Sequence, residues 1–431
     1  MPAGGRPESG LQEERKAASM AEASGKANTV SRRSGKSGGG IHTRAPAVRR
    51  IRKKFRLFSV RSGMDLPFLF LVLVLLVIGL VMMFSASFAN AYYRQNGDSY
   101  FFIRKQALFA ALGVAAMIAL SYFDYHHLHK FAVPVLMVSF LLLVLVRFMP
   151  AINGVHRWID LGPLGQFQPS EVAKFAIVLI FAHLISINFN RMGTFLYGVL
   201  PYALILGATA VLLMWEPHVS ATVIIALLGA VMLFIGGVKL RWFGIAFGLM
   251  GTGVTYLVLF AKEFSYANDR ITAWLNPFSN ATPQLVEDTW QTRQSLYAIG
   301  SGGLLGLGLG QSRQKYLYLP EPQNDFIFAI VCEELGFIGA LIIIILFAML
   351  IWRGITISLK AKDKFGMLLG IGLVVQIGLQ VILNIAVVTN TIPNTGISLP
   401  FFSYGGTSLV ILLAEMGIVL SISRTSSIEK T

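Results

Sequence analysis

Cysteine is almost absent from this 431-residue chain, and charged residues are scarce. The lone Cys332 excludes an internal disulfide and a cysteine-ligated metal cluster. Only 13% of the residues are charged, whereas 55% are hydrophobic and the mean hydropathy is +0.66. A soluble domain of this size needs far more polar surface. The composition therefore places the chain in a lipid bilayer.

Acidic residues are also few, with 21 Asp and Glu against 36 Lys and Arg. A basic excess can indicate nucleic-acid binding, but a large share of it lies in the first 61 residues, which end in RRIRKKFRLFSVR before an apolar run. Basic residues beside a membrane span attract anionic lipid and stay in the cytoplasm. We therefore expect residues 1–62 to be a disordered basic cytoplasmic tail, and we expect no nucleic-acid partner.

Ten apolar runs have about the length, roughly 20 residues, that crosses a bilayer as a helix. They cover residues 66–88, 106–123, 131–149, 171–188, 196–215, 219–237, 242–261, 326–352, 366–389 and 407–422. Helices satisfy their own backbone hydrogen bonds in lipid. The predicted fold is therefore all-α, with ten transmembrane helices.

An even number of spans places both termini on one side of the membrane. The short loops on that side carry Lys130, Arg191, Lys239 and Arg353, so the positive-inside rule assigns it to the cytoplasm. The predicted ten-span domain covers 63–425, and a short cytoplasmic tail covers 426–431. The largest outer loop, 262–325, joins the seventh and eighth helices, and long loops often carry function.

Ionisable residues near two outer span ends are candidates for chemistry, because a charge inside a bilayer is costly. Glu171 and Lys174 lie one helical turn apart, and Asp325 lies at the start of the eighth span. Lys174 and Asp325 can thus meet in a cavity open to the outer side. There a carboxylate can act as a general base toward a substrate hydroxyl. The alternative is that Asp325 only caps its helix and that Lys174 extends its amine to the interface.

Other motifs favour structural roles. Glu333 and Glu334 lie about two turns into the eighth span, where packing and polar contacts are favoured over catalysis. GSGGLLGLGLG at 300–310 has no following Lys-Ser/Thr, so a flexible or tightly turning linker is favoured over a nucleotide loop. The HHLH motif at 126–129 has no convergent carboxylates, which argues against zinc. For His218 in an outer loop, hydrogen bonding is favoured.

Six motifs follow one another along the chain: NGVHRWIDLG, QPSEVAKF, DRITAWLNPF, QTRQSLYAIGSGGLLGLGLG, LPEPQNDFIFAIVCEELGFIG and PNTGISLPFFSYGGTSL. With them the chain resembles the SEDS family (shape, elongation, division and sporulation) over about residues 64–424. The sequence after 305 is more similar to the division and sporulation branch than to the elongation branch.

The resemblance implies a ten-span, GT-C-like glycosyltransferase of the bacterial cytoplasmic membrane. Such enzymes polymerise lipid II into β-1,4-linked glycan on the outer face and release undecaprenyl diphosphate. The implied partners are lipid II, the nascent strand, a class B penicillin-binding protein and other division or sporulation proteins. No cofactor is firmly implied, and a divalent cation, Mg or Mn, stays open. A lipid II flippase and a non-catalytic scaffold for the transpeptidase are the alternatives.

The resemblance also assigns site residues. The family's essential aspartate corresponds to Asp325, and its conserved lysine corresponds to Lys174. The other positions implied to line the substrate cavity are Arg157, Glu171, Arg270, Gln294, Glu321, Ser403 and Tyr404.

The chain departs from the family pattern in two places. Gln323-Asn324-Asp325 stands where His-Thr-Asp is usual, and Pro217-His218 stands where Pro-Asp is common. The implied mechanism is a single inverting displacement in which Asp325 takes the proton of the acceptor 4-hydroxyl, while Lys174, Arg157 or Arg270 offsets charge on the departing diphosphate. A carboxylate beside a lysine is a weak base, so we expect its basicity to rise as substrate desolvates the site.

Overall fold

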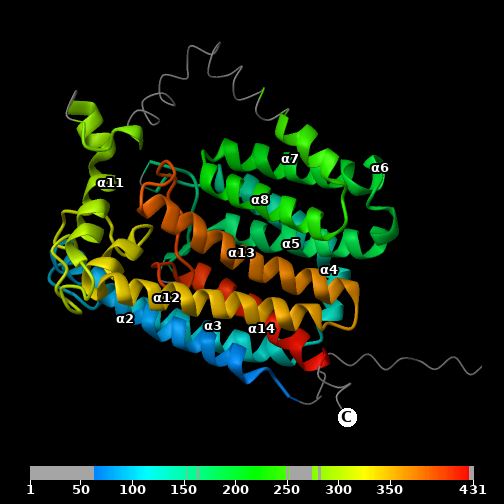
Figure 1. Cartoon of the computed structure of the whole chain (residues 1–431), viewed down its shortest axis with the longest axis horizontal. Coiled ribbons are helices and arrows are strands. Elements are labelled where there is room, and N and C mark those ends of the chain that lie inside the picture. Colours follow the sequence, from blue (N-terminus) through cyan, green and yellow to red (C-terminus); the bar gives the residue numbers. More distant parts are fainter. Residues whose placement is uncertain are drawn as a thin grey trace, which may run out of the picture. The chain divides into compact units, whose positions relative to one another are not determined.

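The computed structural model describes residues 63–152, 154–162, 165–248, 252, 274–279 and 283–426, all of which belong to one compact unit, Arg56–Thr431. Long helices dominate it (Figure 1). The helices are α2 (Leu66–Arg94), α3 (Phe101–Tyr122), η1 (Tyr125–His127), α4 (Leu128–Val146), α5 (Pro169–Asn188), η3 (Phe189–Arg191), α6 (Phe195–Gly198), α7 (Leu200–Trp215), α8 (Val219–Ile235), α11 (Pro283–Gly302), α12 (Ile327–Leu359), α13 (Lys364–Val388) and α14 (Gly406–Ser426).

Within these residues, eight helical segments are long and apolar enough to cross a membrane, and the 17-residue apolar helix α8 is shorter. The protein is therefore a multi-pass membrane protein. Nine of the predicted spans coincide with these helices. The predicted span 242–261 lies mostly outside the described residues, although 240–248 are helical, so the count of ten stays a prediction.

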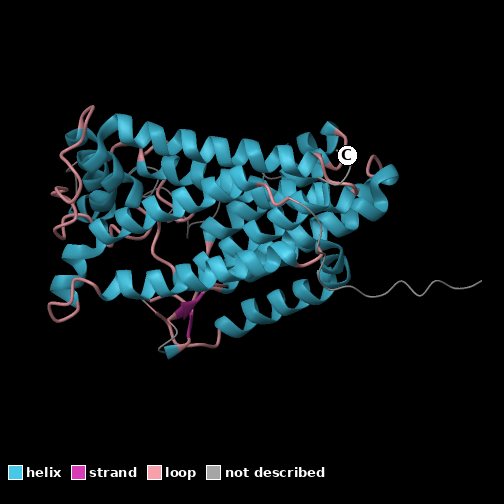
Figure 2. Cartoon of the chain, turned by 90° about the horizontal axis from the view of Figure 1, so that it is seen from below, coloured by secondary structure: helices cyan, strands magenta, loops and turns pink. Residues whose placement is uncertain are grey.

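The structure corrects the sequence prediction in the outer loops. The loop expected at 89–105 is shorter, because α2 continues to Arg94 and α3 begins at Phe101. The fold is not purely helical either, since β1 (Ile159–Asp160) pairs antiparallel with β2 (Gln166–Phe167) (Figure 2). The long loop expected at 262–325 contains the 20-residue helix α11.

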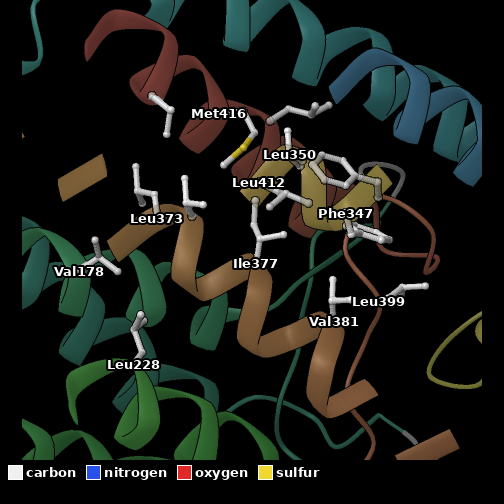
Figure 3. Packing of buried hydrophobic residues seen from close by; sticks show 14 of the residues in the cluster. Val178, Leu228, Phe347, Leu350, Leu373, Ile377, Val381, Leu399, Leu412 and Met416 are labelled. Atoms are coloured by element: carbon white, nitrogen blue, oxygen red, sulfur yellow. The ribbon is translucent and has the colours of Figure 1, made fainter. Parts of the chain in front are cut away.

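Helix α13 lies at the centre of the apolar core, in contact with α5, α8, α12 and α14. Figure 3 shows Leu373 and Ile377 of α13 among side chains of the neighbouring helices. Small residues permit close approach: a Cβ added to Gly372 would stand 2.6 Å from a methyl group of Val178 on α5. Such small-residue contacts are typical of membrane helices, whose packing cannot rely on the hydrophobic effect within lipid.

Helix α12 is broken at Gly336, which has φ 67° and ψ −172°, a conformation that favours glycine. The glycine-rich segment 303–308 supplies the missing hydrogen bonds. The Leu307 and Gly308 N–H groups donate to the carbonyls of Glu333 (2.9 Å) and Glu334 (3.0 Å), and the Phe337 N–H donates to the Gly303 carbonyl (2.9 Å). The linker predicted at 300–310 therefore turns tightly and caps both halves of a discontinuous membrane helix.

Candidate active site

A cavity of about 600 Å³ has residues of the loops after α2, α11 and α13 in its lining. These loops gather at one end of the bundle (Figure 1). Its lining comes from α2, α3, the β-hairpin, α5, α8, α13, α14, the segment 321–325 and the loop 396–405. Segments that are far apart in the sequence thus build one polar chamber.

Asp325 lies in this lining, two residues before α12 begins. It does not cap the helix, because Phe326 occupies the N-cap position and no side chain bonds to that helix end. In the described part of the chain its carboxylate has no hydrogen-bond or ion-pair partner. Its Oδ2 lies against Gly396, where an added Cβ would be 2.9 Å away. The carboxylate is thus available to a ligand in the cavity.

The backbone that carries Asp325 is held at three consecutive carbonyl groups. The Gln323 carbonyl accepts from the Tyr404 N–H (2.8 Å), the Asn324 carbonyl from Ser403 Oγ (2.7 Å), and the Asp325 carbonyl from Asn384 Nδ2 (2.7 Å). Three bonds from α13 and the loop before α14 thus fix the main chain from which the Asp325 side chain extends. Ser403, predicted to contact substrate, lines the cavity and also holds the backbone next to Asp325.

The departure at Gln323-Asn324 has a visible role. Gln323 Oε1 accepts from Asn90 Nδ2 of α2 (3.2 Å), and Asn324 Nδ2 donates to Glu321 Oε2 (2.7 Å). Both side chains therefore hold the segment that leads to Asp325.

The pKa of Asp325 is raised to about 6, first by burial and then by the neighbouring Glu321 carboxylate, while Arg157 opposes the shift. A carboxyl group with a pKa near 6 is a better proton acceptor at neutral pH than an ordinary aspartate. The raised pKa differs from the expected weak base, because no lysine is paired with Asp325 in the described part of the chain.

Lys174 is paired with Glu171 rather than with Asp325. Its Nζ lies 2.8 Å from Glu171 Oε2, and both residues line the cavity. The predicted spacing of one helical turn is confirmed, since the two residues stand at i and i+3 in the first turns of α5. The possible ion pair between Lys174 and Asp325 is not found.

Arg157 also lines the cavity, and its guanidinium donates to the carbonyl of Glu216 (3.4 Å) and to that of Pro217. His218, on the same turn, stands where the family commonly has an aspartate. Burial, with Arg157 and Lys174 nearby, lowers its pKa to about 3. His218 is therefore neutral and cannot replace the charge of a carboxylate.

Seven of the nine predicted site residues line the cavity. These are Arg157, Glu171, Lys174, Glu321, Asp325, Ser403 and Tyr404. The ring of Tyr404 packs edge to face on Phe102, with ring centroids 5.0 Å apart. Gln294 lies buried on α11 and is not part of the lining, and Arg270 lies outside the described residues.

Several lining residues were not predicted. Gln376 and Gln380 of α13 and Glu415 of α14 form the part of the cavity that reaches into the spans, and Gln376 Nε2 donates to Glu415 (3.1 Å). An ionisable residue inside a span is a signal that could have identified Glu415. Arg94 and Lys105 add two cations near the ends of α2 and α3.

Metal-ligand chemistry is not prominent in this arrangement. Among the residues that the structure describes, no group of three or more His, Cys, Asp and Glu is placed to hold a metal ion. Three acidic residues of the cavity instead pair with a lysine, an arginine and an amide group: Glu171, Glu321 and Glu415.

Helices and cavity together define a multi-pass membrane protein that presents one positioned carboxylate in a polar chamber. The family model FTSW_RODA_SPOVE, described as "Cell cycle protein", matches residues 66–428. The chain belongs to this family, as the six motifs predicted.

Curated relatives match nearly end to end. Stage V sporulation protein E of Bacillus subtilis (strain 168) is 42% identical over 371 residues, which cover 85% of this chain and 98% of that protein. A protein of Geobacter sp. (strain M18) named "Probable peptidoglycan glycosyltransferase FtsW" is 39% identical over 367 residues, covering 84% and 97%. The predicted similarity to the division and sporulation branch agrees with both names.

Solved structures share the fold. A chain from a structure reported as "Structural coordination of polymerization and crosslinking by a peptidoglycan synthase complex" superposes with a TM-score of 0.68 at 26% identity, covering 85% of this chain and 99% of that chain. The crystal structure of the Thermus thermophilus rod shape determining protein RodA gives a TM-score of 0.61 at 25% identity, covering 85% and 98%.

Proposed function

We propose that this protein is a peptidoglycan glycosyltransferase that polymerises lipid II into β-1,4-linked glycan strands. Family membership and the names of the curated relatives support the activity. The observation that carries the mechanism is the Asp325 carboxylate in the cavity. It has no hydrogen-bond or ion-pair partner among the described residues, its backbone carbonyl is held by Asn384, and its pKa is raised to about 6.

The reaction is a single displacement. The 4-hydroxyl oxygen of the acceptor sugar attacks the anomeric carbon of the donor, the bond from that carbon to the diphosphate oxygen breaks, and its electron pair leaves with undecaprenyl diphosphate. Asp325 accepts the hydroxyl proton, and the configuration at the anomeric carbon inverts. General base catalysis of this kind contributes about 10²–10⁴ in rate.

The departing diphosphate gains negative charge, so it needs cations nearby. Lys174 and Arg157 line the same cavity as Asp325 and are the described residues that we assign to this role. Arg270 keeps the same predicted role. Glu171 holds Lys174 in place through their 2.8 Å ion pair.

The orientation and partners belong to the same proposal. Both termini lie in the cytoplasm and the cavity opens to the outer face, in agreement with the basic residues that precede the first span in the sequence. A class B penicillin-binding protein crosslinks the strands made here. The similarity to a chain of a peptidoglycan synthase complex supports such an assembly.

A second function, translocation of lipid II, is favoured by one observation. The cavity reaches Gln376 and Glu415 within the spans, where a polymerase needs no polar path. Reconstitution into liposomes with lipid II on the outer leaflet separates the two. Polymerisation predicts glycan chains from this lipid II, and loss of the chains in Asp325→Asn. Transfer of lipid II between leaflets without polymer would support translocation and overturn the polymerase.

A scaffold role makes a different prediction. A scaffold for the transpeptidase tolerates replacement of Asp325 as long as the complex assembles. If the assembled complex of Asp325→Asn with the transpeptidase makes as much glycan as the wild-type complex, the scaffold role is supported and the catalytic proposal is contradicted.

A further inference from the structure

Lys315 and Glu334 form an ion pair that the proposed mechanism does not use. Lys315 Nζ lies 3.0 Å from Glu334 Oε1, and the two side chains are 3% and 0% exposed. Neither residue lines the cavity. Burying two charges costs several kcal/mol per ion before their attraction is counted, so a pair of this kind calls for a reason.

The hydrogen-bonding groups of the Lys315–Glu334 pair are satisfied within the protein, so they are not available to a ligand. The ammonium group of Lys315 donates to Glu334 Oε1, to the Gly310 carbonyl (2.7 Å) and to Ser85 Oγ (3.2 Å). Glu334 also accepts from Ser85 Oγ (2.7 Å) and from the Ser312 N–H (3.2 Å). All three ammonium protons thus have acceptors, which favours a positional role over binding.

The pair joins two pieces of the chain that flank Asp325. Because α12 breaks at Gly336, residues 327–335 form a short half-helix that bonds to the segment 303–308. Glu333 closes the same unit, since it accepts from Ser312 Oγ (2.5 Å) and from the Arg313 N–H (3.0 Å). The half-helix and the segment 303–315 are therefore bonded into one body, and Asp325 lies in the chain between them.

Helix α2 holds this body at two points. Ser85 contacts both Lys315 and Glu334, and Asn90, five residues later on α2, bonds to Gln323. The two contacts bracket the segment from Lys315 to Gln323, which leads directly to Asp325. A shift of the body along α2 would therefore pull on the segment that carries Asp325, whose carbonyls at 323–325 are held from the other side by α13 and the loop before α14.

We infer that the buried cluster of Lys315, Glu334 and Ser85 is a positioning device that sets the place of Asp325 relative to α2 and the cavity. A buried ion pair adds little stability over uncharged residues of similar size, but its directional bonds allow only one register. A displacement of about 1 Å at a reacting group can cost about 10²-fold in rate. The cluster therefore acts on the rate of the chemical step. This inference rests on the proposed glycosyltransferase function.

The test compares wild type, Asp325→Asn and Lys315→Met/Glu334→Gln in one lipid II polymerisation assay, with Tm measured in detergent. The control is Arg353→Met/Asp65→Asn, which removes another ion pair between α2 and α12 (2.7 Å), distant in sequence from Asp325. We expect Lys315→Met/Glu334→Gln to keep its Tm and its KM for lipid II while kcat falls about 10-fold to 100-fold. The control should keep its kcat.

A wild-type kcat in Lys315→Met/Glu334→Gln, or an equal fall in the control, overturns the inference. If the double variant does not fold, Ser85→Ala decides, because it removes the contact to α2 and leaves the ion pair intact. A lowered kcat with unchanged Tm then supports the inference, and an unchanged kcat overturns it. Absence of polymer from wild type would instead count against the proposed function.

Discussion

The described part of the chain contains two buried lysine–glutamate pairs that look alike but lie in different surroundings. Lys174 and Glu171 are 2.8 Å apart with side chains 3% and 14% exposed, and they line the cavity. Lys315 and Glu334 are 3.0 Å apart, 3% and 0% exposed, and sealed between α2 and the outer loop. The difference teaches that burial and pairing alone do not identify a charge that takes part in catalysis. Such a charge must also be accessible from the cavity, as Lys174 is and Lys315 is not.

The largest expected difference between the two pairs is in stability, and it is tested by replacing one lysine at a time. Lys315→Met leaves Glu334 charged, buried and without its cation, which costs about 3–5 kcal/mol. Lys174→Met leaves Glu171 at a cavity where water can reach it, so its cost is smaller. Thermal unfolding in detergent should show the larger loss of Tm for Lys315→Met, and the reverse order would contradict the comparison.

For activity per folded molecule we expect the opposite order, with the larger loss in Lys174→Met and the smaller loss in Lys315→Met. Lys174→Met removes a cation assigned to the departing diphosphate, so we expect the rate to fall about 10²–10³-fold. The measurement is glycan synthesis per folded molecule. A Lys174→Met enzyme with the wild-type rate would remove this lysine from the mechanism.

Gly396→Ala probes the cavity side of Asp325. Gly396 has φ +64°, and its new Cβ would meet Oδ2 of Asp325 at 2.9 Å, so the carboxylate must move. We expect a loss of rate of about 10-fold or more, by the steep dependence of catalysis on position. Gly237→Ala is the matched control, because Gly237 has φ +89° with nothing within 4 Å. Equal losses in both variants would show that backbone strain alone is responsible.

The pH profile gives the smallest but most specific effect. The pKa of Asp325 is raised to about 6, and only its ionised form accepts a proton, so kcat/KM should fall below about pH 6 and level off above it. Glu321→Gln removes a neighbouring negative charge that raises this pKa, so the midpoint should move to lower pH. A midpoint that stays in place would exclude Glu321 as a cause.

Much of the fold could be predicted from the sequence, because apolar length alone locates a membrane helix. The break at Gly336 could not be predicted, since the run 326–352 is long and apolar apart from Glu333 and Glu334, and its partner segment 303–308 is remote in sequence. Helix α11 was missed because it is too polar to be read as a span. The hairpin was missed because its strands have only two residues each.

The sequence predicted which residues form the site better than it predicted which of them contact one another. Motif positions indicated Asp325 and Lys174, but a linear spacing cannot decide which carboxylate a lysine will meet across a bundle. In the structure Lys174 pairs with Glu171, one helical turn away, and not with Asp325. Glu333 and Glu334 were assigned to polar contacts, in agreement with their bonds to the segment 312–315. Their shared role with Lys315 depends on tertiary geometry and left no signal in the sequence.

The central claim is that Asp325 takes the proton from the acceptor sugar, and Asp325→Asn tests it most directly. The amide keeps the size of the side chain and removes the base. Purified variant and wild type should bind lipid II with similar affinity, while the variant polymerises it about 10²–10⁴ times more slowly. Polymerisation by Asp325→Asn at the wild-type rate, with binding unchanged, would contradict the account.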